Sequence, residues 1–134
     1  MVYTDTAFQI LYASQLAPTR QFSCVSDIIT MSRVANEARG LTGALIFDGE
    51  YFCQLLEGDE ATVVALMDRI ATDARHVNVK RLFTGKAGLP RVTRSWRSGY
   101  SEAHQLEVFS RADGPLGEVA LAEFMSVLAG ADME

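Results

Sequence analysis

The chain has 134 residues, 49% of them hydrophobic and 22% charged, which suits one globular domain with a sizeable core and leaves no segment that reads as disordered. Its formal net charge of -5 provides no basic surface for a phosphate backbone, which argues against a nucleic-acid partner. Cys24 and Cys53 have no metal-ligand spacing, no secretion signal opens the chain, and no apolar run approaches the roughly 20 residues that span a bilayer. We therefore expect a soluble, cytoplasmic protein with no metal site and no membrane contact.

The N-terminal part of the chain predicts a strand and then a helix. Residues 8–14 are rich in strand-forming side chains and stop before a proline, which favours a buried strand. From Ser23 the apolar residues recur every three or four positions, Ser23 is available as the N-cap, and Asp27 suits the dipole of the first turn. We expect this helix to end at Gly40.

The next segment predicts a hairpin and a second helix. Two strand-like runs, 41–47 and 51–56, flank an Asp-Gly pair, which is a strong hairpin signal. Asp59 then suits the cap of a helix whose apolar residues again follow the helical period. We expect that helix to end near Arg75-His76.

The remaining residues predict two more strands and a final helix. Residues 77–83 alternate imperfectly as a strand, and a loop over 85–90, a strand around 93–100 and an apolar helix over 117–129 follow. The order of these elements is the βαββαββ arrangement of a ferredoxin-like α+β fold with one added strand. In such a fold two helices cover one face of a single sheet, which leaves the other face in need of a cover.

The terminal helix carries an apolar stripe that can supply this cover. The stripe is wider than one packed surface requires, so we also expect contact with a second copy in a homodimer or a higher homo-oligomer. Its members are Val119, Leu121, Phe124, Met125 and Leu128. We accordingly divide the chain into a main domain, residues 1–103, and a C-terminal helical cap, residues 104–134.

Three polar side chains fall where the pattern predicts burial. Tyr12 lies in the first strand, Gln54 interrupts a hairpin strand, and Asn36 falls four residues after Ser32 on the first helix. Each of them can satisfy another of the three or a loop backbone, because buried polar groups are hydrogen-bonded. Three such residues on one side of a sheet favour a flat, hydrogen-bonding ligand between the two helices.

Short fragments spread over about residues 8–100 match one known family in order and spacing. They are Ile10-Leu11-Tyr12-Ala13-Ser14, Asp27-Ile28-Ile29, Ser32-Arg33 with Asn36, Gly40-Leu41-Thr42-Gly43, Tyr51-Phe52-Cys53-Gln54-Leu55-Leu56-Glu57-Gly58, Arg69-Ile70, Asp73-Ala74-Arg75-His76, and Trp96 with Gly99-Tyr100. On these fragments the chain resembles the BLUF family of blue-light photoreceptors, which bind a flavin without a covalent bond. Each fragment alone is weak, and their common order makes a chance match improbable.

The resemblance implies a photoactive pair and a set of flavin contacts. Tyr12 matches the tyrosine that donates an electron and a proton to the excited flavin, and Gln54 matches the glutamine between that phenol and the ring. Asn36 matches the amide that holds the pyrimidine edge. The implied cofactor is FAD, with FMN as the alternative.

Further residues match the walls and the polar end of the family's site. Ile28 and Ile70 match the aliphatic pair that sandwiches the ring, and the residues that match contacts to the ring edge, ribityl chain or phosphates are Arg69, Asp73, Arg75 and His76. Plainer interpretations stay open for this polar end. Arg69 and Asp73 could form an i,i+4 ion pair, and two cations at a helix C-terminus are favoured by its dipole.

Two positions depart from the family pattern. Ala35 stands where a second polar residue often precedes the asparagine, and Ser98 stands where a methionine is usual, two residues after Trp96. The resemblance implies that Trp96 and this neighbour transmit the signal. Trp96 taken alone would be a core or interface aromatic, and the serine implies that transmission differs from the family's usual form.

We therefore expect a light sensor rather than an enzyme, with a downstream signalling protein as partner, because little sequence remains after Tyr100 for an output domain. One alternative is a small acylphosphatase-like hydrolase of similar topology. The candidate anion loop for it, residues 17–20, lacks the glycines that would expose backbone amides. The other alternative is a ligand-binding module without photochemistry.

Overall fold

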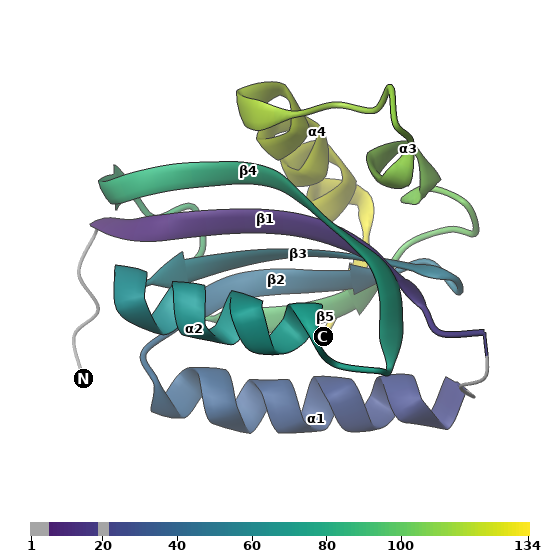
Figure 1. Ribbon diagram of the computed structural model, residues 1–134, viewed down its shortest axis with the longest axis horizontal. Coiled ribbons are helices and arrows are strands. Elements are labelled where there is room, and N and C mark those ends of the chain that lie inside the picture. The colour runs from purple at the N-terminus through teal and green to yellow at the C-terminus, as the bar shows by residue number, and fades with distance from the viewer. Residues whose placement is uncertain (1–5, 19–21) are drawn as a thin grey trace.

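The protein is built on one six-stranded sheet in the computed structural model, which describes residues 6–18 and 22–134 (Figure 1). The strands are β1 (Thr6–Leu16), β2 (Thr42–Phe47), β3 (Tyr51–Gly58), β4 (His76–Pro90), β5 (Trp96–Tyr100) and β6 (Asp132–Met133). They lie side by side in the order β4-β1-β3-β2-β5-β6. The pair β2 and β5 is parallel, and the other neighbours are antiparallel.

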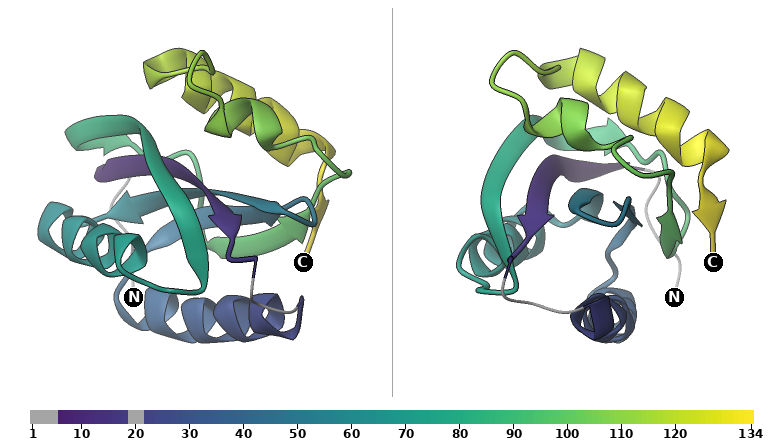
Figure 2. Two further views of the ribbon diagram at one scale, coloured as in Figure 1. Left: turned by 45° about the vertical axis from the view of Figure 1, so that its right-hand side comes forward. Right: turned by 90° about the vertical axis from the view of Figure 1, so that its right-hand side faces the viewer.

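Helices cover both faces of this sheet. The first two, α1 (Phe22–Ala38) and α2 (Glu60–Ala71), lie on one face, while α3 (Glu107–Ser110) and α4 (Gly117–Gly130) lie on the other (Figure 2). This arrangement confirms the expected α+β, ferredoxin-like class with a C-terminal helix. None of the described helices is long and apolar enough to cross a membrane.

Local chemistry explains how the hairpin and the second helix begin. In the turn between β2 and β3, the Asp48 carboxylate accepts hydrogen bonds from the backbone N–H groups of Glu50 and Tyr51, at 3.0 and 2.7 Å. Gly49, which follows Asp48 in this turn, has φ 102°, which glycine adopts without steric cost. Asp59 caps α2 as expected, since its side chain accepts from the N–H of Thr62 at 3.3 Å.

Two expectations about the helix ends are wrong. Ser23 lies inside α1, which begins at Phe22, and Asp27 lies beyond the first turn of that helix. The second helix ends at Ala71 instead of near Arg75-His76. Beyond Ala71 the Asp73 side chain accepts from the backbone N–H of Arg75 at 2.9 Å, a local bond that competes with helix continuation.

Two strand boundaries also differ from the prediction. The expected loop over 85–90 belongs to β4, because this part of the chain pairs with the start of β1, Pro90 opposite Thr6 and Leu89 opposite Ala7. The last main strand begins at Trp96 rather than near Thr93. Both backbone N–H groups of Val92 and Thr93 donate to the Glu57 carboxylate, at 2.8 Å each, and this holds the preceding segment as a loop.

The two faces of the sheet have differently organised cores. Strand alternation sends Leu11, Ala13, Cys53 and Leu55 toward α3 and α4, where they join one apolar cluster. The opposite face has two separate clusters. One, with Ile10, Tyr12, Leu56, Val63 and Met67, lies under α2, and the other, with Val25, Ile29, Phe47, Phe52 and Trp96, lies under α1. The core is therefore interrupted between α1 and α2.

The stripe on α4 covers the sheet as expected, with one exception. Phe124 is fully buried, and Leu121, Met125 and Leu128 pack against the same cluster. Val119 is 62% exposed and faces away from the sheet. Fully buried Ala120 takes the inward position beside it, so the packed stripe is narrower than the sequence indicates.

Candidate functional site

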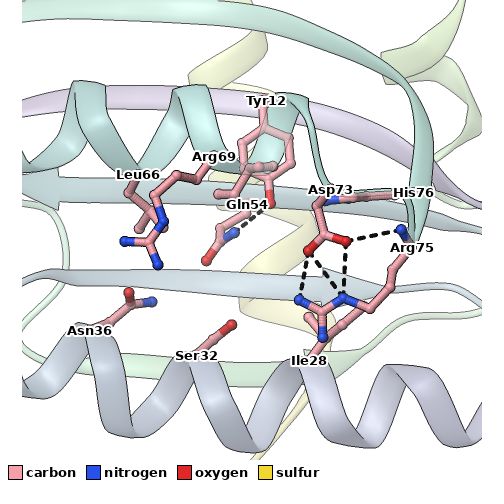
Figure 3. A pocket seen from close by; sticks show the side chains of 11 residues that line it. Tyr12, Ile28, Ser32, Asn36, Gln54, Leu66, Arg69, Asp73, Arg75 and His76 are labelled. Atoms are coloured by element: carbon pink, nitrogen blue, oxygen red, sulfur yellow. Dashed lines mark hydrogen bonds and ion pairs between the residues drawn. The ribbon is translucent and has the colours of Figure 1, made fainter.

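A cavity of about 130 Å³ lies where the core is interrupted, between α1, α2 and the sheet (Figure 3). Every residue predicted to hold a cofactor lines it, together with Ser32 and Leu66. The predicted residues are Tyr12, Ile28, Asn36, Gln54, Arg69, Ile70, Asp73, Arg75 and His76. Segments far apart in the sequence thus converge on one pocket.

The floor of the cavity is a hydrogen-bonded pair on neighbouring strands. Tyr12 of β1 lies directly opposite Gln54 of β3, and the Gln54 Nε2 donates to the Tyr12 Oη at 2.5 Å. At the other end of the amide, Gln54 Oε1 accepts from the indole Nε1 of Trp96 on β5 at 3.0 Å. Gln54 is therefore held between a phenol and an indole.

The phenol of Tyr12 is fully enclosed by protein. Burial raises the pKa of Tyr12 well above its ordinary value, and the hydrogen bond from Gln54 offsets only part of that rise. The phenol is therefore neutral at any physiological pH, and it can release its proton only together with another change at the site.

The walls of the cavity come from the two helices. On α1 the four-residue spacing of Ile28, Ser32 and Asn36 places all three on the side that faces the cavity (Figure 3). Ile70 of α2 lines the opposite wall. The Asn36 residue is 2% exposed, and among the described residues its side-chain amide has no hydrogen-bond partner, which leaves donor and acceptor capacity for a ligand.

The polar end of the cavity contains an ion pair in the turn after α2. Asp73 pairs with Arg75, with Nη2 and Oδ2 2.6 Å apart, and not with Arg69 as the i,i+4 interpretation would have it. The hydrogen bonds from Arg75 lower the pKa of the Asp73 carboxyl, and burial opposes them. The pair is charged and partly buried, and Arg69 is left directed into the cavity (Figure 3).

His76 lies at the start of β4 and is buried. Its Nδ1 is 3.0 Å from the hydroxyl of Ser14 on β1. Burial lowers the pKa of His76, Asp73 raises it and Arg75 lowers it further, with burial the largest effect. The ring is therefore neutral near pH 7, which removes the interpretation of His76 as a cation at a helix terminus.

The structure brings in several residues that sequence reasoning missed. Ser32 and Leu66 share a helix face with predicted residues, so their spacing was a usable signal. The Glu57 carboxylate is fully buried, and it accepts from Gln9 Nε2 at 2.7 Å and from the loop before β5. Nothing local in the sequence indicates that long-range role.

The two residues expected to transmit a signal lie beside the cavity, on β5. Trp96 is 7% exposed and Ser98 is fully buried, and the two share one face of the strand. The Ser98 hydroxyl accepts from Arg33 Nη2 of α1 at 2.9 Å. Trp96 thus contacts the floor of the site, and Ser98 contacts a helix wall.

Comparison with known proteins places this geometry in a family. The family model described as BLUF, sensors of blue-light using FAD, matches residues 7–98, more than half of the chain. Over 88 residues the chain is 30% identical to the blue light- and temperature-regulated antirepressor BluF of Escherichia coli (strain K12). The matched segment makes up 60% of this chain and 22% of that protein. The chain is also 37% identical over 60 residues to the photoactivated adenylate cyclase subunit alpha of Euglena gracilis. That match makes up 42% of this chain and 6% of that protein. The chain therefore spans a small part of these relatives.

Solved structures agree with this match. BlsA in its ground state aligns with a TM-score of 0.76 at 26% identity, over 96% of this chain and 91% of that one. A Klebsiella pneumoniae BlrP1 complex aligns with a TM-score of 0.63 at 27% identity, over 90% of this chain and 28% of that one. By sequence and by fold, the chain belongs to the BLUF family of flavin-binding blue-light sensors.

Proposed function

We propose that this chain is a blue-light receptor that binds FAD non-covalently between α1 and α2, and that light changes the hydrogen bonds of Gln54. One observation carries the proposal. Gln54 lies at the floor of the cavity with Nε2 2.5 Å from the phenol of Tyr12 and Oε1 3.0 Å from the indole N–H of Trp96.

The residues around the cavity suit a flat ring with a polar edge. Ile28 and Ile70 present aliphatic surface from opposite helices, which fits the two faces of an isoalloxazine. The free amide of Asn36 can both donate to and accept from the pyrimidine edge. Arg69, Arg75 and neutral His76 provide further donors at the polar end, and Asp73 holds Arg75 in place.

A flavin held in this cavity would supply the absorption of blue light and an excited state able to accept an electron. Tyr12 is an oxidisable side chain that lines the cavity, and the energetic cost of a buried charge means that its proton must leave with the electron. Gln54 is the polar group within hydrogen-bond reach of that phenol. Tyr12 therefore acts as the donor of the electron and the proton, and the side-chain amide of Gln54 changes its orientation in response.

The two ends of the Gln54 amide contact different partners, so a reversal of the amide changes both hydrogen bonds. A half-turn of the amide places Oε1 toward the Tyr12 phenol, which can then donate to it. The same half-turn places the amide NH₂ toward the Trp96 indole N–H, so that two donors face each other, because an indole cannot accept. The Trp96 bond must then break, and a change at the floor of the site reaches β5.

We infer that FAD is the natural cofactor in preference to FMN. A second hollow of about 380 Å³ shares Leu66 and Arg69 with the cavity, and Arg39 also lines it. Two guanidinium groups suit the phosphates that extend beyond the ring. Release of the bound flavin from purified protein, followed by chromatography, would identify it, and a predominance of FMN would contradict this choice.

We propose that the output of the chain is a conformational signal to a separate protein, with no catalysis by this chain. The relatives named an antirepressor and an adenylate cyclase subunit join sensing to other activities in longer proteins. Within this chain, we propose that residues 104–134 form a cap on the domain of residues 1–103. The acylphosphatase-like alternative rests on a loop of which residues 19 and 20 lie outside the described residues.

We further propose a homodimer formed at the N-terminal end of α4. Most of the predicted stripe packs internally, but Leu116 and Val119 are 56% and 62% exposed. A second copy is the simplest partner for such a surface. Light scattering should give a dimer for the native chain and a monomer for Val119→Arg, whereas a native chain that is monomeric at high concentration would contradict the dimer.

Tyr12→Phe tests the central proposal. The purified native chain should be yellow and should shift its absorption slightly to the red in blue light, reversibly in the dark. Tyr12→Phe keeps the ring and loses the phenol, so flavin should stay bound and the normal shift should vanish.

Tyr100→Phe is the matched control for that variant, because Tyr100 is an exposed tyrosine on β5. It should behave as the native chain does. A colourless native protein that cannot be loaded with FAD would overturn the whole function. A normal light-induced shift in Tyr12→Phe would overturn the assignment of the donor.

A further inference from the structure

Arg33 contacts both buried residues on the inner face of β5. Its Nη2 donates to the Ser98 hydroxyl at 2.9 Å, and its guanidinium carbon lies 5.9 Å from the centre of the Trp96 ring. Arg33 projects from α1, and Ser98 lies 65 residues further along the chain. One side chain thus bridges a helix wall of the cavity to the strand that carries the tryptophan.

No acidic side chain competes for Arg33 among the described residues. The ion pairs there join Arg75 to Asp73 and Arg81 to Asp68. The contact with β5 is therefore the main polar interaction that the structure gives Arg33. A cation over an indole ring and a charge-assisted bond to a fully buried hydroxyl both favour this placement.

The backbone of β5 is already held from both edges. Its neighbour β2 pairs with it on one side, and on the other the backbone N–H of Glu134 donates to the Ser98 carbonyl at 2.8 Å. The strand itself has little freedom to move. The part of β5 that can move is the Trp96 side chain. Its indole N–H is hydrogen-bonded to Gln54, and the guanidinium of Arg33 lies over its ring.

We propose that Arg33 is a positioning residue that, together with Ser98, holds the Trp96 indole against Gln54 in the dark. This inference rests on the proposed function and adds to it a determinant of the photocycle in a side chain that does not line the flavin cavity. Because the half-turn of Gln54 requires the Trp96 bond to break, the Arg33–Ser98 bridge sets how readily that bond is lost. Weakening the bridge shifts Trp96 toward its released position.

The chain has a single tryptophan, so one indole N–H resonance reports on Trp96 alone. Exchange of that proton with solvent requires its release from Gln54. In full-length protein kept in the dark, Arg33→Met and Ser98→Ala should each speed the exchange about tenfold, the size expected for loss of one charge-assisted hydrogen bond. The double variant should exchange no faster than the faster single variant, because both changes break the same bridge.

Arg97→Met is the matched control. Arg97 lies between Trp96 and Ser98 on β5 and is exposed on the opposite face, so its removal alters charge and strand composition without touching the bridge. Its exchange rate should equal that of the native chain. Arg33→Lys, which keeps a cation and a donor, should restore part of the protection.

Light provides the second measurement. Arg33→Met and Ser98→Ala should change the rate of dark recovery by about tenfold in the same direction, whereas Arg97→Met should leave it unchanged. Indole exchange and recovery that match the native chain in both variants would overturn the role of Arg33. A native chain without any photocycle would overturn the proposed function instead, while the exchange experiment would still decide whether Arg33 positions Trp96.

Discussion

The two faces of the sheet are packed differently, although alternate residues of the same strands form both. On the face under α4, Leu11 and Cys53 join one continuous apolar cluster. On the face under α1 and α2 the apolar residues form two separate clusters, and Tyr12 of the cluster under α2 is hydrogen-bonded to Gln54 at the floor of the cavity. The first face is therefore packed without a break, and the second contains the cavity between α1 and α2. The interruption of the core between α1 and α2 leaves room for a ligand.

The largest effect is expected from a cavity on the α4 face. Phe124 is fully buried in the apolar cluster, so Phe124→Ala should lower the free energy of unfolding by about 3–5 kcal/mol. Glu123→Ala, at an exposed position of the same helix outside the proposed dimer contact, should change it by less than about 0.5 kcal/mol. Denaturant titration of both variants measures the difference. Equal values would mean that α4 does not stabilise the sheet.

A smaller and different effect is expected on the α1 and α2 face. Asn36→Ala removes an amide that has no partner among the described residues, so it should cost little folding stability. It should weaken flavin binding by about 1–3 kcal/mol if the amide contacts the ring edge. Glu37→Ala, exposed on the same helix, is the control. Titration of flavin into stripped protein gives both affinities, and equal affinities would remove Asn36 from the site.

The smallest effect concerns acid stability, and it arises from His76. Burial lowers the pKa of His76 below its ordinary 6.5, so the unfolded chain binds this proton more readily than the folded one. The protein should lose stability as pH falls from about 6.5 to the folded-state pKa of His76, with no further loss from this group below that. His76→Asn should remove this part of the pH dependence.

The other histidine is the control for that experiment. His104 is exposed with φ 66°, a conformation that asparagine tolerates, so His104→Asn should keep the pH dependence. Asp73 acts in a separate window, because its lowered pKa gives stability that is lost only as pH falls below its ordinary 3.8. A native slope just below pH 6.5 that survives His76→Asn would contradict the burial argument.

The sequence by itself determined the order of the main elements, β1 to β5 with α1, α2 and α4, and most of their inward faces, whereas it indicated neither α3 nor β6. Strand alternation accounts for the opposite sides taken by Gln54 and Cys53, and four-residue spacing accounts for the shared face of Ile28 and Asn36 on α1. These properties follow from local geometry, because a period of two or of 3.6 residues is set by the backbone itself. The family resemblance then pointed to residues that the structure gathers around one cavity, although their roles toward flavin remain proposals.

Only the tertiary structure decided which polar groups meet. Arg69 is as close in sequence to Asp73 as an i,i+4 pair requires, yet α2 ends at Ala71 and the carboxylate turns to Arg75. The loop before β5 is held by Glu57, and Ser98 is bonded by Arg33 across 65 residues. A donor and an acceptor far apart in the chain are paired by the packing of whole elements. No local pattern encodes that choice, because it depends on where every other element has come to lie.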